Sequence, residues 1–240
     1  MNKILQKSVY IFTFVIFTSC MGPKALQRQV NRKTYEVPLV YTTPIVKDKS
    51  DKTVFIEYST ARTTMKAETQ VIKHRGFYLP LILAYIWDYD MKINLGDDAS
   101  GPKVTNTIET ITRKVFSRSG NFTITTDKSQ ADYIATIELN KAKANCEYHR
   151  GGAAVFNSMS QSESAEKSVG RLNMHVLLTQ NDLVILDKEF EEKGENGFVG
   201  TTENISNIKH SAMKNLIENL VELSENNAYN IVQEINSLIK

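Results

Sequence analysis

An alternation of apolar and polar side chains over residues 85–95, with Ile86 as its exception, constrains the fold of this chain more than any other feature. The odd-numbered positions, from Tyr85 to Leu95, are all apolar, and the even-numbered positions from Asp88 to Asn94 are all polar. Successive side chains of a β-strand point to opposite faces, so the pattern predicts a half-buried antiparallel strand. We therefore expect a sheet with one apolar and one polar face.

Shorter alternating runs predict the other strands of this sheet. They cover residues 53–59, 122–124 and 133–139, the last of which we expect to continue toward Tyr148. Residues 171–179 and 183–190 also alternate, and the polar residues between them are typical of a turn, so these two runs predict a hairpin.

Helical periodicity appears in two places. Pro102 opens a run in which apolar residues recur every three to four positions, and Gly120 fits a left-handed stop after it. From about Thr202 to the C-terminus the same period predicts a long helix, which the polar residues 224–227 would break in two. The expected fold is α+β, with two layers: an antiparallel or mixed sheet covered on one face by helices, including the long C-terminal one.

The first nineteen residues are typical of a secretory signal peptide. Lys3 and Lys7 precede an apolar run over residues 9–17, and the small residues Thr18 and Ser19 follow it. The apolar run is about ten residues long, whereas a membrane-spanning helix needs about 20, so a permanent span is not expected.

Phe17-Thr18-Ser19-Cys20 resembles the lipobox of bacterial lipoproteins. The resemblance implies that Cys20 becomes the first residue of the mature chain and carries a diacylglycerol thioether, which anchors the protein to a membrane surface. A plain signal peptide or an uncleaved anchor is the alternative. With Cys20 acylated, Cys146 is a half-buried free thiol without a partner. The residues that follow Cys20, from Met21 on, lack an acidic cluster like the surface-export tag in lipoproteins of the Bacteroidota. We therefore expect an outer-membrane lipoprotein that faces the periplasm.

The expected organisation is a signal peptide over 1–19, a lipidated N-terminus and tether over 20–52, and a single α+β domain over 53–240. A composition of 41% hydrophobic and 23% charged residues is that of a globular protein and excludes disorder or collagen for the whole chain. The net charge of +2 excludes an electrostatic binder of nucleic acid.

Signatures of catalysis are absent from the sequence. It contains no HExxH, Gly-x-Ser-x-Gly, phosphate-loop or GxGxxG motif. Cys146 and His149 lie three residues apart and could form a metal site with His175, but we prefer to interpret them as solvated polar residues around a strand end, because a second ligand pair is missing. Asp88 and Asp90 share a strand face, as a catalytic carboxylate pair would, yet that face is normally wet. We expect no enzyme, no cofactor and no metal.

Residues 77–87 form the most apolar stretch outside the signal segment. Its end is expected to be a core strand, with Pro80 at an edge or an entry bend. In the alternative interpretation, Phe77, Tyr78, Leu79 and Leu81 present an exposed apolar patch to a partner or an acyl chain.

Residues 151–168 are rich in glycine and serine and are expected to be a long connector between two strands. Loops of this length are usually disordered or functional. Val155 and Phe156 have no evident core to enter, so a mobile loop that touches a membrane or a partner is the alternative to plain disorder.

Residues 130–137 and 171–176, with the hairpin and the C-terminal helix, resemble a group of cell-envelope lipoproteins: the lipopolysaccharide-assembly lipoprotein and the auxiliary lipoproteins of ABC-type and curli-type export. The resemblance implies a non-enzymatic accessory module with a protein or lipid-like partner. Two other hypotheses are open. The first is a carrier that holds one hydrophobic ligand against Trp87, Tyr89 and Met91, and the second is a hydrolase with dispersed residues.

Overall fold

The computed structural model describes residues 39–60, 66–80, 84–96, 102–155, 158–196 and 205–239. They form one eight-stranded mixed sheet and two α-helices, with a short 3-10 turn, η2, at Lys128–Gln130. The strands are β1 (Thr53–Thr60), β2 (Lys66–Leu79), β3 (Ala84–Gly96), β4 (Thr123–Thr125), β5 (Tyr133–Val155), β6 (Ser158–Ala165), β7 (Ser168–Gln180) and β8 (Leu183–Asn196). The helices are α3 (Pro102–Ser119) and α4 (Ile205–Leu238).

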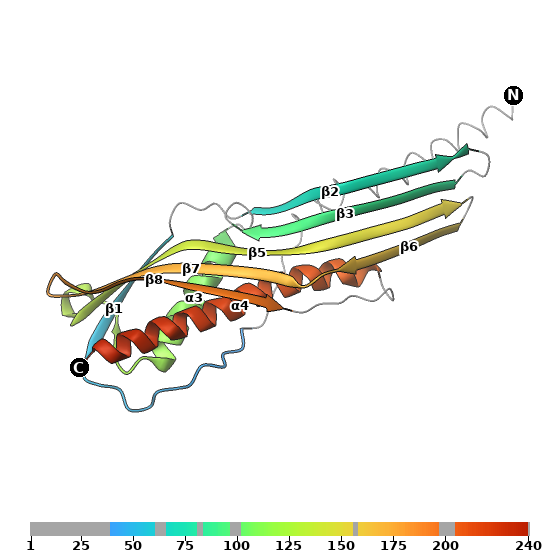
Figure 1. Cartoon of the computed structure of the whole chain (residues 1–240). Helices are drawn as coiled ribbons and strands as arrows, with labels where there is room; N and C mark the ends of the chain where they lie inside the picture. Colours follow the sequence, from blue (N-terminus) through green and yellow to red (C-terminus); the bar gives the residue numbers. More distant parts are fainter. Residues whose placement is uncertain are drawn as a thin grey trace, which may run out of the picture.

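The 23-residue strand β5 is the spine of the sheet, with a length of about 75 Å at 3.3 Å per residue. Its first half lies between β1, which is parallel to it, and β7. Its second half lies between β3 and β6, both antiparallel to it. The sheet therefore has two regions end to end: a body that contains β1, β4, β7 and β8, and an arm formed by β2, β3, residues 143–155 of β5, and β6 (Figure 1).

One irregularity keeps the apolar side chains of β5 on a single face. The buried residues are odd-numbered from Tyr133 to Leu139 and even-numbered from Ala142 to Arg150. The pairing with β7 shifts register between Leu139 and Lys141. One extra residue at a bulge reverses the parity of the residues that follow, so the same face stays buried along both regions.

The prediction of a two-layer fold with helices covering one face of the sheet is wrong. Helix α4 packs against β5, β6, β7 and β8, whereas α3 packs mainly on α4 and makes lesser contacts with β1 and β4 of the body (Figure 1). The sheet is longer than expected, because β2 and β6 add strands where the sequence predicted none, and two helices cannot cover it. The long C-terminal helix itself is confirmed.

The connector expected over residues 151–168 is largely sheet. Residues up to Val155 continue β5, and β6 begins at Ser158, so the two strands form a hairpin. The serines of β6 alternate with Met159, Gln161, Glu163 and Ala165, which is a period of two that the small side chains concealed. β2 was also missed. Its first residues are mostly polar, and a bulge between Val71 and Lys73 shifts the alternation of the residues that follow.

Helix α4 is continuous through residues 224–227, where the sequence predicted a break. The Ser224 hydroxyl donates to the Leu220 carbonyl, 2.5 Å away. The Asn227 amide donates to the Phe190 carbonyl of β8 at 2.9 Å. Glu225 accepts the backbone N–H groups of Thr42 and Thr43 at 2.5 and 2.7 Å. Each of these three side chains makes a hydrogen bond that leaves the helical backbone in place, so none of them ends the helix.

Gly120 ends α3 for a different reason from the one expected. No glycine in the described ranges has a positive φ. A Cβ at position 120 would lie 2.7 Å from both the Phe116 carbonyl oxygen and the Phe122 ring. Glycine is therefore required because the chain passes close to itself, and not because of a left-handed conformation.

Part of the segment expected as a tether packs on the body. Leu39 and Tyr41 lie against the core, and Thr43 is buried. Val46 donates its N–H to the Arg118 carbonyl at the end of α3. Residues 39–46 are therefore held to both helices.

Candidate functional site

The two hairpins of the arm end at the same place. Leu79 pairs with Ala84 at the end of the β2–β3 hairpin, and Val155 pairs with Ser158 at the end of the β5–β6 hairpin. Ala84 also pairs with Val155, so the two ends are adjacent (Figure 1). Two stretches about 75 residues apart in the sequence thus meet at the far end of the arm.

Large apolar side chains are exposed around these ends. Phe77 is 61% exposed and Ile86, directly opposite it, is 45% exposed. Tyr78 is 45% and Met159 52% exposed, and they belong to a row of paired residues on the other face of the sheet. We call the four-strand end that carries Phe77, Tyr78, Ile86 and Met159 the apolar tip.

The candidate contact residues from the sequence gather at this tip. Phe77 and Tyr78 are exposed, and Leu79 and Val155 lie beside them half-buried. Leu81 and Phe156 lie outside the described residues. Ile86 and Met159 were missed, because Ile86 was attributed to the core strand and Met159 to a loop.

Trp87 lies next to the tip but is 2% exposed. Its ring stacks on Tyr85, with 5.7 Å between ring centroids. It also packs on Gly152, where a Cβ would come within 2.3 Å of the indole. Within the described residues, the indole N–H has no hydrogen-bond partner. Trp87 is therefore a packing residue of the arm; Tyr89 and Met91 also belong to β3.

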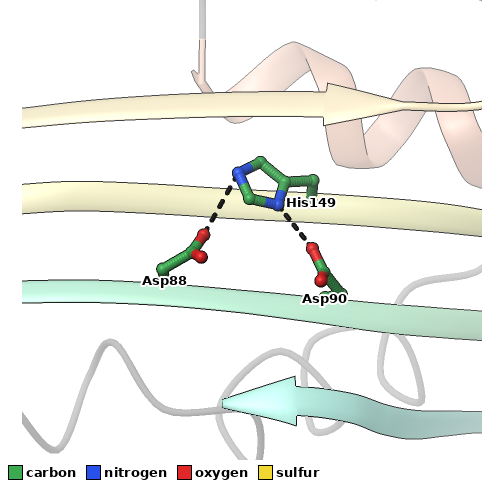
Figure 2. Close-up of side chains that lie close together, drawn as sticks. All are labelled: Asp88, Asp90 and His149. Atoms are coloured by element: carbon green, nitrogen blue, oxygen red, sulfur yellow. Dashed lines mark hydrogen bonds and ion pairs between the residues drawn. The ribbon is translucent and has the colours of Figure 1, made fainter. Parts of the chain in front are cut away.

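A histidine and two aspartates converge on the opposite, partly exposed face of the arm (Figure 2). Asp88 and Asp90 share this face because they lie two apart on β3, and His149 pairs with Asp90 across β3 and β5. His149 Nδ1 lies 2.5 Å from Asp90 Oδ1, and Nε2 lies 3.2 Å from Asp88 Oδ1. The sequence predicted the carboxylate pair but not the histidine.

Both ring nitrogens of His149 face carboxylate oxygens. A doubly protonated ring donates to both aspartates, and a neutral ring donates to one of them. Three such groups within 4.8 Å of one another are also potential ligands of a metal ion. In the observed orientation, however, the two carboxylates lie on different sides of the ring, so one ion cannot bind both without a rotation of the imidazole.

Cys146 and His175, which the sequence placed near His149, are not part of this cluster. Cys146 lies three residues before His149 and therefore on the other face of β5, where it is buried. Burial raises the pKa of its thiol to about 12. His175 contacts Asp187 of β8 at 2.7 Å in the body.

A surface depression of about 570 Å³ lies away from both the tip and the histidine. It is lined by polar and charged residues of β8 and the end of α4, among them Lys188, Glu192 and Glu234. Cys20 lies outside the described residues. Neither described helix carries an apolar run long enough to cross a membrane.

Comparisons with known proteins do not assign this chain to a family. No family model matches it, and no curated protein matches it. The crystal structure of protein XCC0632 from Xanthomonas campestris, described as family DUF330, is similar with a TM-score of 0.37 and 12% identity. That likeness covers 86% of this chain and 97% of the other. Similarity at this level leaves the fold family of the chain open.

Proposed function

We propose that this chain is a lipid-anchored, non-enzymatic accessory module of a bacterial cell envelope. Acyl chains on Cys20 hold it to the outer membrane, on the periplasmic side. The arm then brings the apolar tip against a protein or lipid-like partner during envelope assembly or export. The lipobox-like sequence Phe17-Thr18-Ser19-Cys20 supports the anchor.

The observation that carries the contact role is the meeting of two distant apolar stretches at one exposed end. An isolated exposed Phe or Ile is ordinary on a protein surface, but a group of them marks an interaction site. Here Phe77, Ile86 and Met159 come from three strands and gather where the two hairpins end. A long rigid sheet is suited to hold such an end away from the body.

The chemistry of the arm is consistent with binding. The Asp88–His149–Asp90 cluster lies on an open sheet face, and the surface depression between β8 and α4 is lined by other residues. A general acid or base normally works in a site that positions substrate and excludes water. The carrier hypothesis gains no support from Trp87, because Tyr85 and Gly152 occupy two sides of its ring.

Affinity capture of the acylated protein from its own envelope tests the proposal. The tip variant Phe77→Ser/Ile86→Ser removes exposed apolar area, and the control Leu183→Ser/Val184→Ser removes similar exposed side chains from the β7–β8 turn at the other end of the sheet. We expect mass spectrometry to identify an envelope component that the tip variant loses and the control retains. A protein that is recovered alone, or a partner that both variants retain, would contradict the accessory role.

A further inference from the structure

We infer that the apolar tip contacts a lipid bilayer, at the depth of the headgroup interface, in the membrane that holds the Cys20 anchor. This inference rests on the proposed function for the anchor and adds the identity of the surface that the arm meets. It is carried by how charge, aromatic rings and strand ends are arranged along the arm, together with the length of chain that precedes the described residues.

Charges stop at the same level on all four strands of the arm. Residues 76–87 and residues 151–162 contain no Asp, Glu, Lys or Arg. The first charges beyond these stretches are Arg75, Asp88, Arg150 and Glu163. Arg75 pairs with Asp88, and Arg150 pairs with Glu163 one residue further from the tip. A charged side chain in hydrocarbon costs several kcal/mol, so an uncharged end with a sharp boundary fits a surface that excludes charge.

Aromatic side chains lie between the charges and the tip. Tyr78 pairs with Tyr85, and Tyr85 stacks on Trp87, so three rings occupy one face within about 10 Å of the strand ends. Tyr is enriched at membrane–water interfaces, where its ring is apolar and its O–H remains near water, whereas Trp87 is buried behind the two tyrosines. If the tip bound in a pocket of another protein, nothing would require tyrosines at the level where the charged residues begin.

The open edges of the arm limit how deeply it can enter. β2 pairs only with β3, and β6 pairs only with β5, within the described chain. Their outer N–H and C=O groups lack strand partners, and unpaired backbone groups in hydrocarbon cost several kcal/mol each. From Ala84 to Trp87 the uncharged strand is about 10 Å long. Contact at the interface buries the exposed side chains and leaves the edges in contact with water and headgroups.

The anchor can reach the same membrane. The nineteen residues 21–39 span at most about 63 Å when extended. The described chain begins near the middle of the sheet, because Thr42 binds Glu225 and the neighbouring Leu223 packs on Gly170. Gly170 pairs with Ala144, and Val155 lies eleven residues further along β5, or about 36 Å. Acyl chains and tip therefore fit on one bilayer.

Quenching of tryptophan fluorescence by brominated lipid tests the contact, because Trp87 is the one tryptophan of the chain. The acylated full-length protein is bound to vesicles of phosphatidylethanolamine and phosphatidylglycerol, with increasing amounts of phospholipid brominated near the headgroup. We expect Trp87 emission to fall as the brominated fraction rises. The variant Phe77→Asp/Ile86→Asp should lose the quenching, while Leu183→Asp at the other end of the sheet should keep it.

Flotation of the same vesicles separates the two proposals. If the wild-type protein floats with the vesicles but Trp87 is not quenched, the bilayer contact is wrong and the anchor stands; a tip-dependent crosslink to an envelope protein would then identify a protein as the occupant. If the wild type does not float, or Cys20→Ser floats equally well, the lipid anchor itself is wrong. An unchanged emission maximum in the tip variant confirms that Trp87 is still packed.

Discussion

At the scale of single residues, Gly152 determines how closely the strands of the arm pack. A Cβ at this position would lie 2.3 Å from the Trp87 ring and 2.6 Å from the Ser160 carbonyl oxygen. The ring is packed on Tyr85 and the carbonyl is backbone, so neither can move away cheaply. At the adjacent Gly151, the nearest atoms to a Cβ lie 3.5 Å or more away.

We predict that Gly152→Ala lowers the free energy of unfolding by about 2–3 kcal/mol, which is the cost of overpacking a filled site. The matched control, Gly151→Ala, should change it by less than about 1 kcal/mol, because the new methyl group meets only ordinary contacts. Denaturant unfolding followed by Trp87 fluorescence measures both. Equal effects of the two substitutions would contradict the packing described for the arm.

Cys146 should be chemically inert in the folded protein. Burial raises the pKa of its thiol to about 12, and the thiolate is the reactive form. At pH 8 we expect alkylation to be roughly 1,000-fold slower in the folded than in the unfolded chain, since three pKa units separate the two states. Mass spectrometry after timed alkylation measures the ratio, and rapid labelling under native conditions would contradict the burial.

The same shift predicts the direction of a pH effect on stability. Because the folded state keeps the thiol neutral, its contribution is fully present below the unfolded pKa of 9.0 and is lost as pH rises from there toward 12. The loss approaches about 1.4 kcal/mol per pH unit. Cys146→Ala should therefore show a shallower decline in unfolding free energy between pH 9 and 10 than the wild type; parallel declines would contradict the shift.

At the scale of elements, the polar residues in the middle of α4 connect it to the rest of the body. Glu225 is buried and accepts two backbone N–H groups from Thr42 and Thr43. The sequence of residues 224–227 alone indicates a helix end, since such side chains often cap helices. Only the tertiary structure reveals the partners of Glu225 and Asn227, which come from the segment near residue 42 and from β8.

We predict that Glu225→Ala releases residues 39–46 from α4. Two N–H groups, of which that of Thr43 is buried, lose their carboxylate acceptor, at a cost of about 2 kcal/mol. Hydrogen exchange should become faster at Thr42 and Thr43, while α4 remains protected. Glu222→Ala on the exposed side of the same helix is the control and should leave exchange unchanged. Unchanged protection in Glu225→Ala would contradict the contact.

The strands could be predicted from the sequence only where large side chains alternate with polar ones. β1, β3, β7 and β8 have that pattern and were found. β6 alternates serine with mixed residues, and the end of β5 is glycine and alanine, so hydrophobic periodicity is faint there. The site was predicted only in part. Phe77 and Val155 were each predicted as contact residues, but their proximity depends on the register of β2, β3 and β5, which the hydrophobic pattern does not reveal.

At the scale of the whole molecule, the body and the arm have different roles in the proposed function. The body contains α3 and most of the buried core, and α4 extends from it to β6 of the arm. The body also binds the segment that leads back toward Cys20. The arm carries the apolar tip at the far end of β5 (Figure 1). With the proposed anchor at Cys20 and the contact surface at the far end of the sheet, we expect the protein to work close to a membrane.

We predict that Cys20→Ser moves the protein from the membrane fraction to the soluble fraction without unfolding it. Several acyl chains, at about 0.8 kcal/mol per buried CH₂, give durable binding that the tip alone does not replace. Cell fractionation with immunoblotting shows the location, and the thermal midpoint of the purified variant should equal that of the unacylated wild-type chain. Retention in the membrane fraction would contradict the role of Cys20.

Photocrosslinking in the native envelope tests the contact role of the tip most directly. A photoreactive phenylalanine replaces Tyr78 at the tip or, as the control, Val184 at the opposite end of the sheet; both side chains are exposed. We expect irradiation to link position 78, but not position 184, to envelope lipid or to an envelope protein. Absence of a product at position 78, or equal products at both positions, would contradict the claim that the arm is the contact element of this protein.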